Sequence, residues 1–154
     1  MSHYNPWPLG ALPASWQRPE PRQLREAGYH WDDPRDINAI FETKLAQYAG
    51  AKHAVLTDCC TNAVFLSLLF EVEVGSLRSG TEIFIPDRTY VSIPQAIYHA
   101  GLKPQLVSKE WSGAYSLEGS LVIDGAGRFT SGMYTEPNAM HCLSFQIKKR
   151  LPIG

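Results

Sequence analysis

The sequence lacks any apolar run close to the roughly 20 residues that a membrane-spanning helix needs. Its N-terminus also lacks the basic and apolar regions of a secretory signal. Neither charge is in clear excess, because 14 basic and 15 acidic side chains leave a net charge of −1, which argues against nucleic acid or an anionic membrane as a partner. The three cysteines, of which Cys59 and Cys60 are adjacent, form neither a disulfide framework nor a CxxC metal motif. These absences predict a soluble, cytoplasmic protein.

What the sequence does contain is enough apolar material for a packed core. Apolar residues make up 44% and aromatic residues 11% of the chain, which argues against disorder of the whole chain. The 154 residues suffice for one ordinary domain and are too few for two full-sized ones. There is no internal repeat and no low-complexity segment.

The first 35 residues differ in composition from the rest. They hold six of the eleven prolines and three of the four tryptophans. This density of proline predicts an extended arm, and the tryptophans favour an arm that lies on a partner surface, in this chain or in another subunit. The alternative is a poorly ordered leader. We therefore divide the chain into an arm, residues 1–35, and a main domain, residues 36–154.

The main domain has the alternating pattern of an α/β protein. A helix is expected to start at Asp33 and Pro34 and to stop at Gly50. Strands and helices then alternate, which predicts a mostly parallel sheet covered by helices on both faces. The expected strands are 53–57, 82–85, 121–123 and 142–145, with a further one beginning at 106–107, and the expected helices are 62–73 and 92–99.

Chemically useful side chains follow four of these strands, where open α/β sheets bind their ligands. A helix N-terminus at Thr61 offers a seat for an anion, Tyr90 offers a flat ring, Asp124 a carboxylate and Lys148 or Lys149 an amine. Each feature alone has a commoner structural explanation as a cap, a core ring, a turn or a solvated face. Together they suit a phosphorylated aromatic cofactor that a lysine holds as an imine.

Five ordered blocks carry a family resemblance: residues 41–55, 59–64, 85–91, 122–126 and 144–149. From Phe41 to the last residue the chain resembles the pyridoxal-phosphate-dependent sugar aminotransferases of the DegT/StrS type, a group of fold type I. The resemblance implies a partial large domain of that fold. It also implies pyridoxal 5′-phosphate as the cofactor, an amino donor such as glutamate and a keto-sugar nucleotide as the acceptor.

The resemblance assigns a role to each candidate residue. Lys149 would hold the cofactor and move protons, because the family's lysine lies five positions after a serine, here Ser144, and Gly154 keeps the register of a later glycine turn. Asp124 would pair with the pyridine nitrogen and Tyr90 would stack on the ring. The phosphate would be held by three residues, Cys60, Thr61 and Ser144.

Three departures from the family pattern stand out. Cys60 replaces the glycine of the phosphate loop, and Gly127 stands where the family carries Gln or His, a contact that is lost or moves to Arg128. The stretch 110–121 is too short for the strand, helix and strand that normally precede the aspartate.

The chain also stops before the family's remaining strands and its C-terminal domain. We therefore expect these 154 residues alone to be inactive and to associate, as a homodimer or with a missing C-terminal half. Two other interpretations stay open. One is a non-catalytic remnant that binds a partner chain, and the other is a small flavodoxin-like domain that binds an anion without pyridoxal phosphate.

Overall fold

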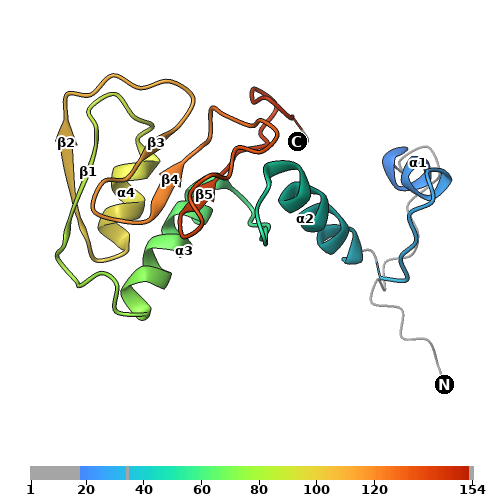
Figure 1. Cartoon of the computed structure of the whole chain (residues 1–154), viewed down its shortest axis with the longest axis horizontal. Helices are drawn as coiled ribbons and strands as arrows, with labels where there is room; N and C mark the ends of the chain where they lie inside the picture. Colours follow the sequence, from blue (N-terminus) through green and yellow to red (C-terminus); the bar gives the residue numbers. More distant parts are fainter. Residues whose placement is uncertain (1–17, 34, 153–154) are drawn as a thin grey trace. The chain divides into compact units, whose positions relative to one another are not determined.

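The computed structural model describes residues 18–33 and 35–152 and forms two compact units, Met1–Ile37 and Asn38–Gly154, each described here by itself. Figure 1 labels the helices and strands of both units. Within the described residues, no helix is both long enough and apolar enough to cross a membrane.

The described part of the first unit contains one short helix, α1 (Glu20–Glu26). The prediction of an extended arm is therefore wrong for these seven residues. Pro21 lies in the first turn, where a backbone N–H has no partner within the helix, so proline is tolerated there. The guanidinium of Arg25 lies 4.3 Å from the ring centroid of Trp31, which is 8% exposed. The arm's first 17 residues lie outside the described part of the chain.

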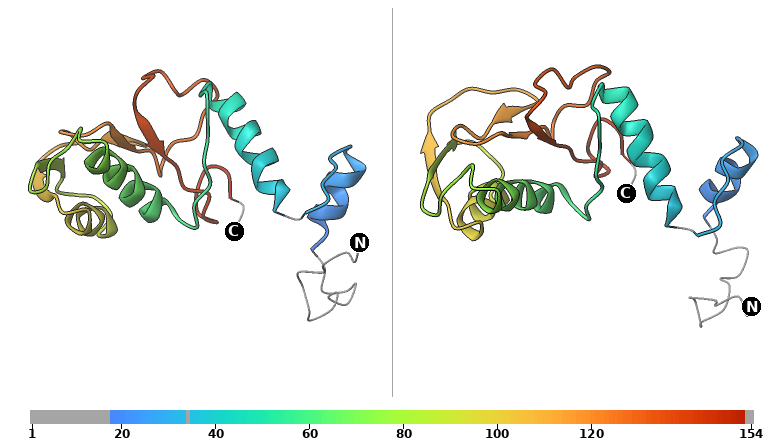
Figure 2. Two further views of the ribbon diagram at one scale, coloured as in Figure 1. Left: turned by 90° about the horizontal axis from the view of Figure 1, so that it is seen from below. Right: turned by 60° about the horizontal axis from the view of Figure 1, so that its bottom comes forward.

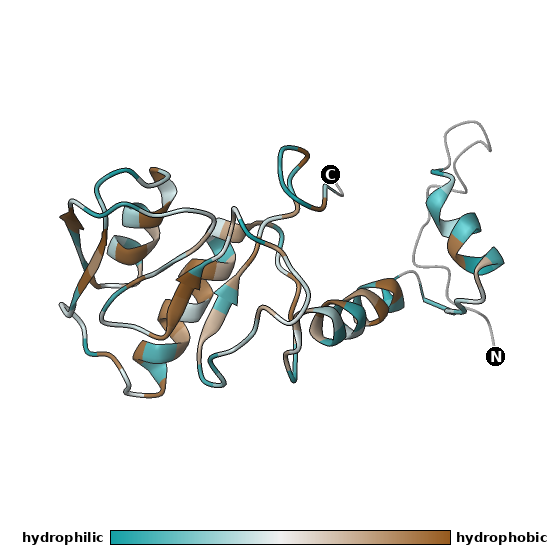
Figure 3. Ribbon diagram, turned by 45° about the horizontal axis from the view of Figure 1, so that its top comes forward, coloured by the Kyte–Doolittle hydropathy of each residue, from teal (hydrophilic) through white to brown (hydrophobic). Residues whose placement is uncertain are grey.

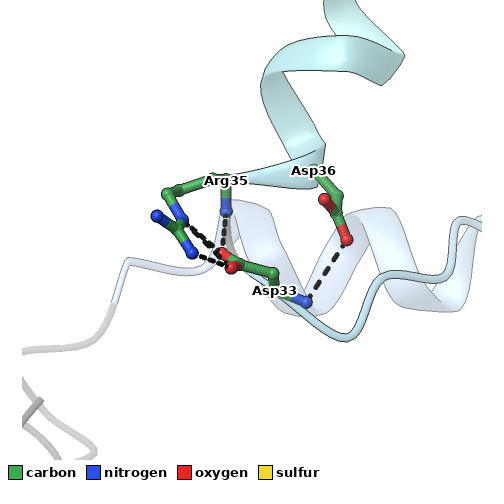
Figure 4. Close-up of polar contacts among 3 residues, drawn as sticks. All are labelled: Asp33, Arg35 and Asp36. Carbon is green, nitrogen blue, oxygen red and sulfur yellow. Dashed lines mark hydrogen bonds and ion pairs between the residues drawn. The ribbon is translucent and has the colours of Figure 1, made fainter. Parts of the chain in front are cut away.

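Helix α2 (Asp36–Ala49) confirms the helix expected between Asp33 and Gly50. At its start, the Asp33 carboxylate accepts the backbone N–H of Arg35 at 2.9 Å and pairs with the guanidinium of the same residue (Figure 4). These bonds lower the pKa of Asp33 to about 2. At the other end, Gly50 adopts a φ of 76°, a left-handed conformation that terminates helices and suits glycine.

The strand expected at 53–57 does not form. Residues 51–57 run without regular structure, and Val55 is 81% exposed. The backbone N–H of Leu56 donates to the Glu42 carboxylate at 2.7 Å rather than to a neighbouring strand. An apolar run becomes a strand only when another strand pairs with it, and none of the described strands does so here.

Next come helix α3 (Cys60–Glu73), strand β1 (Glu82–Pro86), helix α4 (Ser92–His99) and strand β2 (Lys103–Val107). Both expected helices and the strand expected at 82–85 are confirmed, with α3 starting two residues early. Strand β2 ends at Val107, whereas the prediction had a strand begin near there. β1 and β2 pair in parallel, from Glu82 opposite Lys103 to Pro86 opposite Val107.

A second, three-stranded sheet follows, in the order β3 (Tyr115–Ser116), β4 (Val122–Asp124), β5 (Met140–Cys142). β3 pairs with β4 antiparallel, and β4 with β5 in parallel. The expected mostly parallel sheet is therefore corrected to two small sheets, of which one is mixed. The short stretch before β4 holds a hairpin, which forces an antiparallel pair. The strand expected at 142–145 ends at Cys142.

The core of the second unit lies between these strands and the pair of helices α3 and α4. The two helices lie on the same side of the strands in Figures 1 and 2. Figure 3 shows apolar residues gathered in α3 and in the strands, whereas α1 is mostly hydrophilic. On the face of β1 that points away from these helices, Phe84 is 39% exposed. The expectation that helices cover both faces of the sheet is therefore wrong at this strand. Fully buried side chains include Val64, Leu68, Ile83, Ile85, Ile97, Leu117 and Val122.

Candidate functional site

A buried carboxylate ends strand β4. Asp124 is 5% exposed and accepts two hydrogen bonds, one at each oxygen. The hydroxyl of Tyr115 donates to Oδ2 at 2.9 Å, and the backbone N–H of Ala126 donates to Oδ1 at 3.0 Å. Both donors are neutral, so they stabilise a carboxylate at this depth without cancelling its charge. The negative charge of Asp124 therefore remains available to a cationic partner.

The N-terminus of α3 lies beside this carboxylate. Cys59 precedes the helix in an extended conformation, and no side chain caps the first turn. The N–H of Ala63 is bonded to the Cys59 carbonyl at 3.0 Å, whereas the amides before it in the first turn lie outside the helical ladder. Such amides, together with the helix dipole, form a seat for an anion. The Thr61 hydroxyl is within 2.8 Å of the hydroxyl of Ser92, the first residue of α4, so part of its bonding capacity is used.

The pKa of the Cys60 thiol depends on its burial and on the charges around it. Burial raises its pKa to about 12, the charges of Asp124 and Cys142 raise it further, and the ammonium of Lys149 opposes them. The charges of Asp124 and Lys149 thus both act on the pKa of this thiol, which places these two residues within electrostatic range of Cys60. At neutral pH the thiol is uncharged and does not repel an anion at the N-terminus of α3.

The segment after β5 distinguishes the two candidate lysines. Lys149 is half-buried and its backbone N–H donates to the Gln146 carbonyl at 2.8 Å, whereas Lys148 is exposed. The Phe145 ring, three residues before Lys148, packs between those of Phe41 and Phe129, with centroid distances of 5.6 and 5.4 Å. These three rings, named here the aromatic cluster, attach the lysine segment to α2. The burial of the two side chains favours Lys149.

Two of the predicted residues have no such support. The Tyr90 ring is 73% exposed, and its backbone carbonyl accepts the N–H of Ile93 at the start of α4. Ser144 lies two residues beyond β5 and is half-buried. Their roles in stacking and in phosphate binding remain predictions.

Tyr115 contacts Asp124 directly, although no role for it was predicted from the sequence. A signal for it exists, because Gly119 and Ser120 separate two short apolar runs in the manner of a hairpin. In the structure the Leu117 N–H donates to the Val122 carbonyl at 2.9 Å, and this hairpin sets Tyr115 opposite Asp124.

Solved structures with a similar chain trace include two of GDP-4-keto-6-deoxymannose-3-dehydratase. The first, with a trapped PLP–glutamate adduct, has a TM-score of 0.43 and 21% identity over 56% of this chain and 22% of that one. The second, from E. coli with bound hydrated PLP, has a TM-score of 0.44 and 21% identity over 62% and 25%.

Similar curated proteins include two that match only part of this chain. The spore coat polysaccharide biosynthesis protein SpsC of Bacillus subtilis is 36% identical over 42% of this chain and 15% of its own length. The GDP-perosamine synthase of Caulobacter vibrioides is 33% identical over 46% of this chain and 18% of its own length. The matched segments thus span less than a fifth of either relative.

A family-level match covers more of the chain. Residues 27–112 match the DegT/DnrJ/EryC1/StrS aminotransferase family. This range includes Cys60, Thr61 and Tyr90, whereas Asp124, Ser144 and Lys149 lie beyond it. The matched range is more than half of the 154 residues. The chain therefore belongs to the DegT/DnrJ/EryC1/StrS aminotransferase family.

Proposed function

We propose that the second unit forms part of the pyridoxal-phosphate site of a sugar aminotransferase. The observation that carries this proposal is the buried Asp124 carboxylate at the end of β4, beside the N-terminus of α3. The family is dependent on pyridoxal phosphate, and three groups present here match the three polar parts of that cofactor. They are an anion seat for the phosphate, a carboxylate for the ring nitrogen and an amine for the aldehyde.

Each residue then has a defined task. Asp124 would accept the N–H of the pyridine ring and keep that nitrogen protonated, and the free amides at the start of α3 would bind the phosphate with Cys60, Thr61 and Ser144. Lys149 would hold the cofactor through its Nζ and then carry a proton to and from the substrate carbon. When bound, the cofactor supplies an electron sink for the breaking of a bond at that carbon. Tyr90 would cover the ring face.

The substrate class rests on the relatives. One is a spore coat polysaccharide biosynthesis protein and another a GDP-perosamine synthase, and both names concern sugars. They support a sugar substrate, linked to a nucleotide in the case of the GDP-perosamine synthase. The keto group of the amino acceptor and glutamate as the amino donor rest on the family resemblance alone. Because the matched segments span less than a fifth of these relatives, we assign to this chain cofactor binding and leave turnover to a complete active site.

The proposal is tested by adding pyridoxal phosphate to the purified chain, reducing with borohydride and mapping the labelled peptide. We expect label on Lys149, which Lys149→Ala abolishes and Lys148→Ala, the matched control on the exposed neighbour, leaves intact. Label on Lys148 would contradict the register of the segment. No reducible adduct under saturating cofactor would contradict cofactor binding itself.

A second candidate function is the binding of a partner chain, and one surface favours it. Leu66 and Phe70 of α3 and Val74, which caps the C-terminus of that helix, are spaced four residues apart and are 51%, 58% and 54% exposed. Residues at this spacing form a continuous stripe on one face of a helix, and exposed apolar stripes mark protein contacts. Size-exclusion chromatography tests this function, since Phe70→Glu should convert an associated form into a monomer. A wild-type chain that is monomeric at all concentrations contradicts self-association through this stripe.

A further inference from the structure

Three hydrogen-bonding side chains form a continuous network behind the proposed ring site. The Tyr115 hydroxyl lies between Thr89 Oγ1 and Asp124 Oδ2 and is hydrogen-bonded to both, at 2.9 Å from Asp124 Oδ2. Tyr115 and Asp124 are each 5% exposed, and Thr89 is half-buried. The network therefore runs from the loop after β1 into the interior of the second unit.

The chemistry of the three groups sets the direction of the bonds. A carboxylate can only accept, so the single phenolic proton of Tyr115 goes to Asp124. The Tyr115 oxygen then accepts the hydroxyl proton of Thr89. Because Ala126 N–H donates to the other oxygen of Asp124, the plane of the carboxylate is held from two sides.

The position of Tyr115 is itself fixed by packing. Tyr115 lies opposite Asp124 in the β3–β4 hairpin. The rings of Trp111 and Tyr115 pack against each other with a centroid distance of 4.7 Å. The Trp111 indole N–H donates to the Arg88 carbonyl at 2.9 Å, one residue before Thr89. Substitution of Tyr115 by Phe removes the hydroxyl and leaves these packing contacts in place.

We propose that Tyr115 is a positioning residue that aims the Asp124 carboxylate at the ring nitrogen of pyridoxal phosphate and couples it, through Thr89, to the loop that carries Tyr90. This inference rests on the proposed function. In this role Tyr115 acts through its hydrogen bond to Asp124. The network thus links Asp124, which is assigned to the ring nitrogen, with Thr89, the residue next to Tyr90, which is assigned to the ring face.

Titration of the 154-residue chain with pyridoxal phosphate, followed by absorbance, tests the inference. Tyr115→Phe should weaken binding about tenfold, since a hydrogen bond to a charged group is lost. Thr89→Val should weaken binding about threefold. Tyr134→Phe is the matched control, because it removes a phenol that donates to the Pro137 carbonyl at 2.9 Å and lies in another loop, and it should leave the affinity unchanged.

A double-mutant cycle distinguishes positioning from a general structural effect. If Tyr115 acts through Asp124, the double variant Tyr115→Phe/Asp124→Asn should bind as weakly as Asp124→Asn alone. Multiplying effects, or an unchanged affinity of Tyr115→Phe, would overturn the inference while leaving cofactor binding established. If Tyr115→Phe fails to fold, the same cycle with Thr89→Val decides in the same way. Absence of binding by the wild-type chain overturns the proposed function, and this inference with it.

Discussion

A backbone hydrogen bond connects Gly127, three residues after Asp124, with Gly113. The Gly127 N–H donates to the Gly113 carbonyl at 3.0 Å, and a Cβ on Gly127 would lie 2.9 Å from that same oxygen. The family pattern has Gln or His at this position, but here the approach of the Gly113 loop leaves no room for a side chain. The departure at Gly127 thus has a steric cause. The contact that the longer side chain would make to the cofactor is not available from this residue.

We predict that Gly127→Ala destabilises the chain by about 1–3 kcal/mol, because the clashing atom belongs to the backbone and cannot rotate away. Urea unfolding at constant protein concentration measures the change. Gly75→Ala serves as the control, since a Cβ there meets no atom within 4 Å and the substitution reports only the strain of a φ of 78°. Equal stability of Gly127→Ala and the wild type would contradict the steric explanation.

The thiols should differ sharply in reactivity. Burial raises the pKa of Cys60 to about 12 and that of Cys142 to about 11, whereas Cys59 is exposed. The thiolate is the reactive form, so at pH 8 an alkylating reagent should modify Cys59 alone. Mass spectrometry of the labelled chain measures this, and denaturant should expose all three thiols. Rapid labelling of Cys60 in the folded chain would show that the α3 N-terminus is open to solvent.

The aromatic cluster should control the order of the lysine segment. Phe145→Ala removes the ring that packs between Phe41 and Phe129, which should cost about 1–3 kcal/mol for a half-buried aromatic side chain. Hydrogen exchange of residues 144–149 should accelerate, and the yield of borohydride label on Lys149 should fall. Ile147→Ala is the control in the same segment, because Ile147 is 72% exposed. An equal effect of both substitutions would remove the cluster from this role.

A buried carboxyl on α3 should make stability depend on pH. Glu71 is 2% exposed, and its carboxylate accepts the N–H of Leu121, the residue before β4, at 3.0 and 3.1 Å. Burial raises its pKa above the ordinary value of 4.5. The folded state therefore binds the proton more tightly than the unfolded state, and the contribution of Glu71 to stability falls as pH rises from 4.5 through the raised value.

Glu71→Gln keeps an acceptor for Leu121 and removes the titration. We expect it to flatten the pH dependence and to add about 1 kcal/mol at pH 7, since no charge is then buried. Glu71→Ala should instead lose about 2–3 kcal/mol, because the Leu121 N–H loses its partner and a cavity remains. Thermal unfolding from pH 4 to pH 8 measures both. A steeper pH dependence in Glu71→Gln would contradict the assignment.

Local sequence determined the helices of the second unit. The helices expected over 62–73 and 92–99 form as α3 and α4, because helical hydrogen bonds join residues four apart and are specified within the segment. The strand predicted over 82–85 is confirmed as β1, since a short apolar run followed by a proline is typical of a strand. The candidate residues Thr61 and Asp124 followed from local pattern as well, because Thr61 lies at the predicted start of a helix and Asp124 directly follows the apolar run 121–123. Cys60 was assigned through the family resemblance.

Tertiary structure decided the rest. Residues 53–57 have the composition of a strand but do not form one. The backbone hydrogen bonds of a strand go to a second strand, and the sequence of the segment does not specify that partner. The contact of Tyr115 with Asp124 could not be predicted for the same reason, because their hydrogen bond depends on the register of the β3–β4 hairpin. The pKa of Cys60, likewise, depends on Asp124 and Lys149, which folding brings near it from 64 and 89 residues further along the chain. Burial and pairing between distant residues are properties of the folded chain, and they determine which predicted groups share one site.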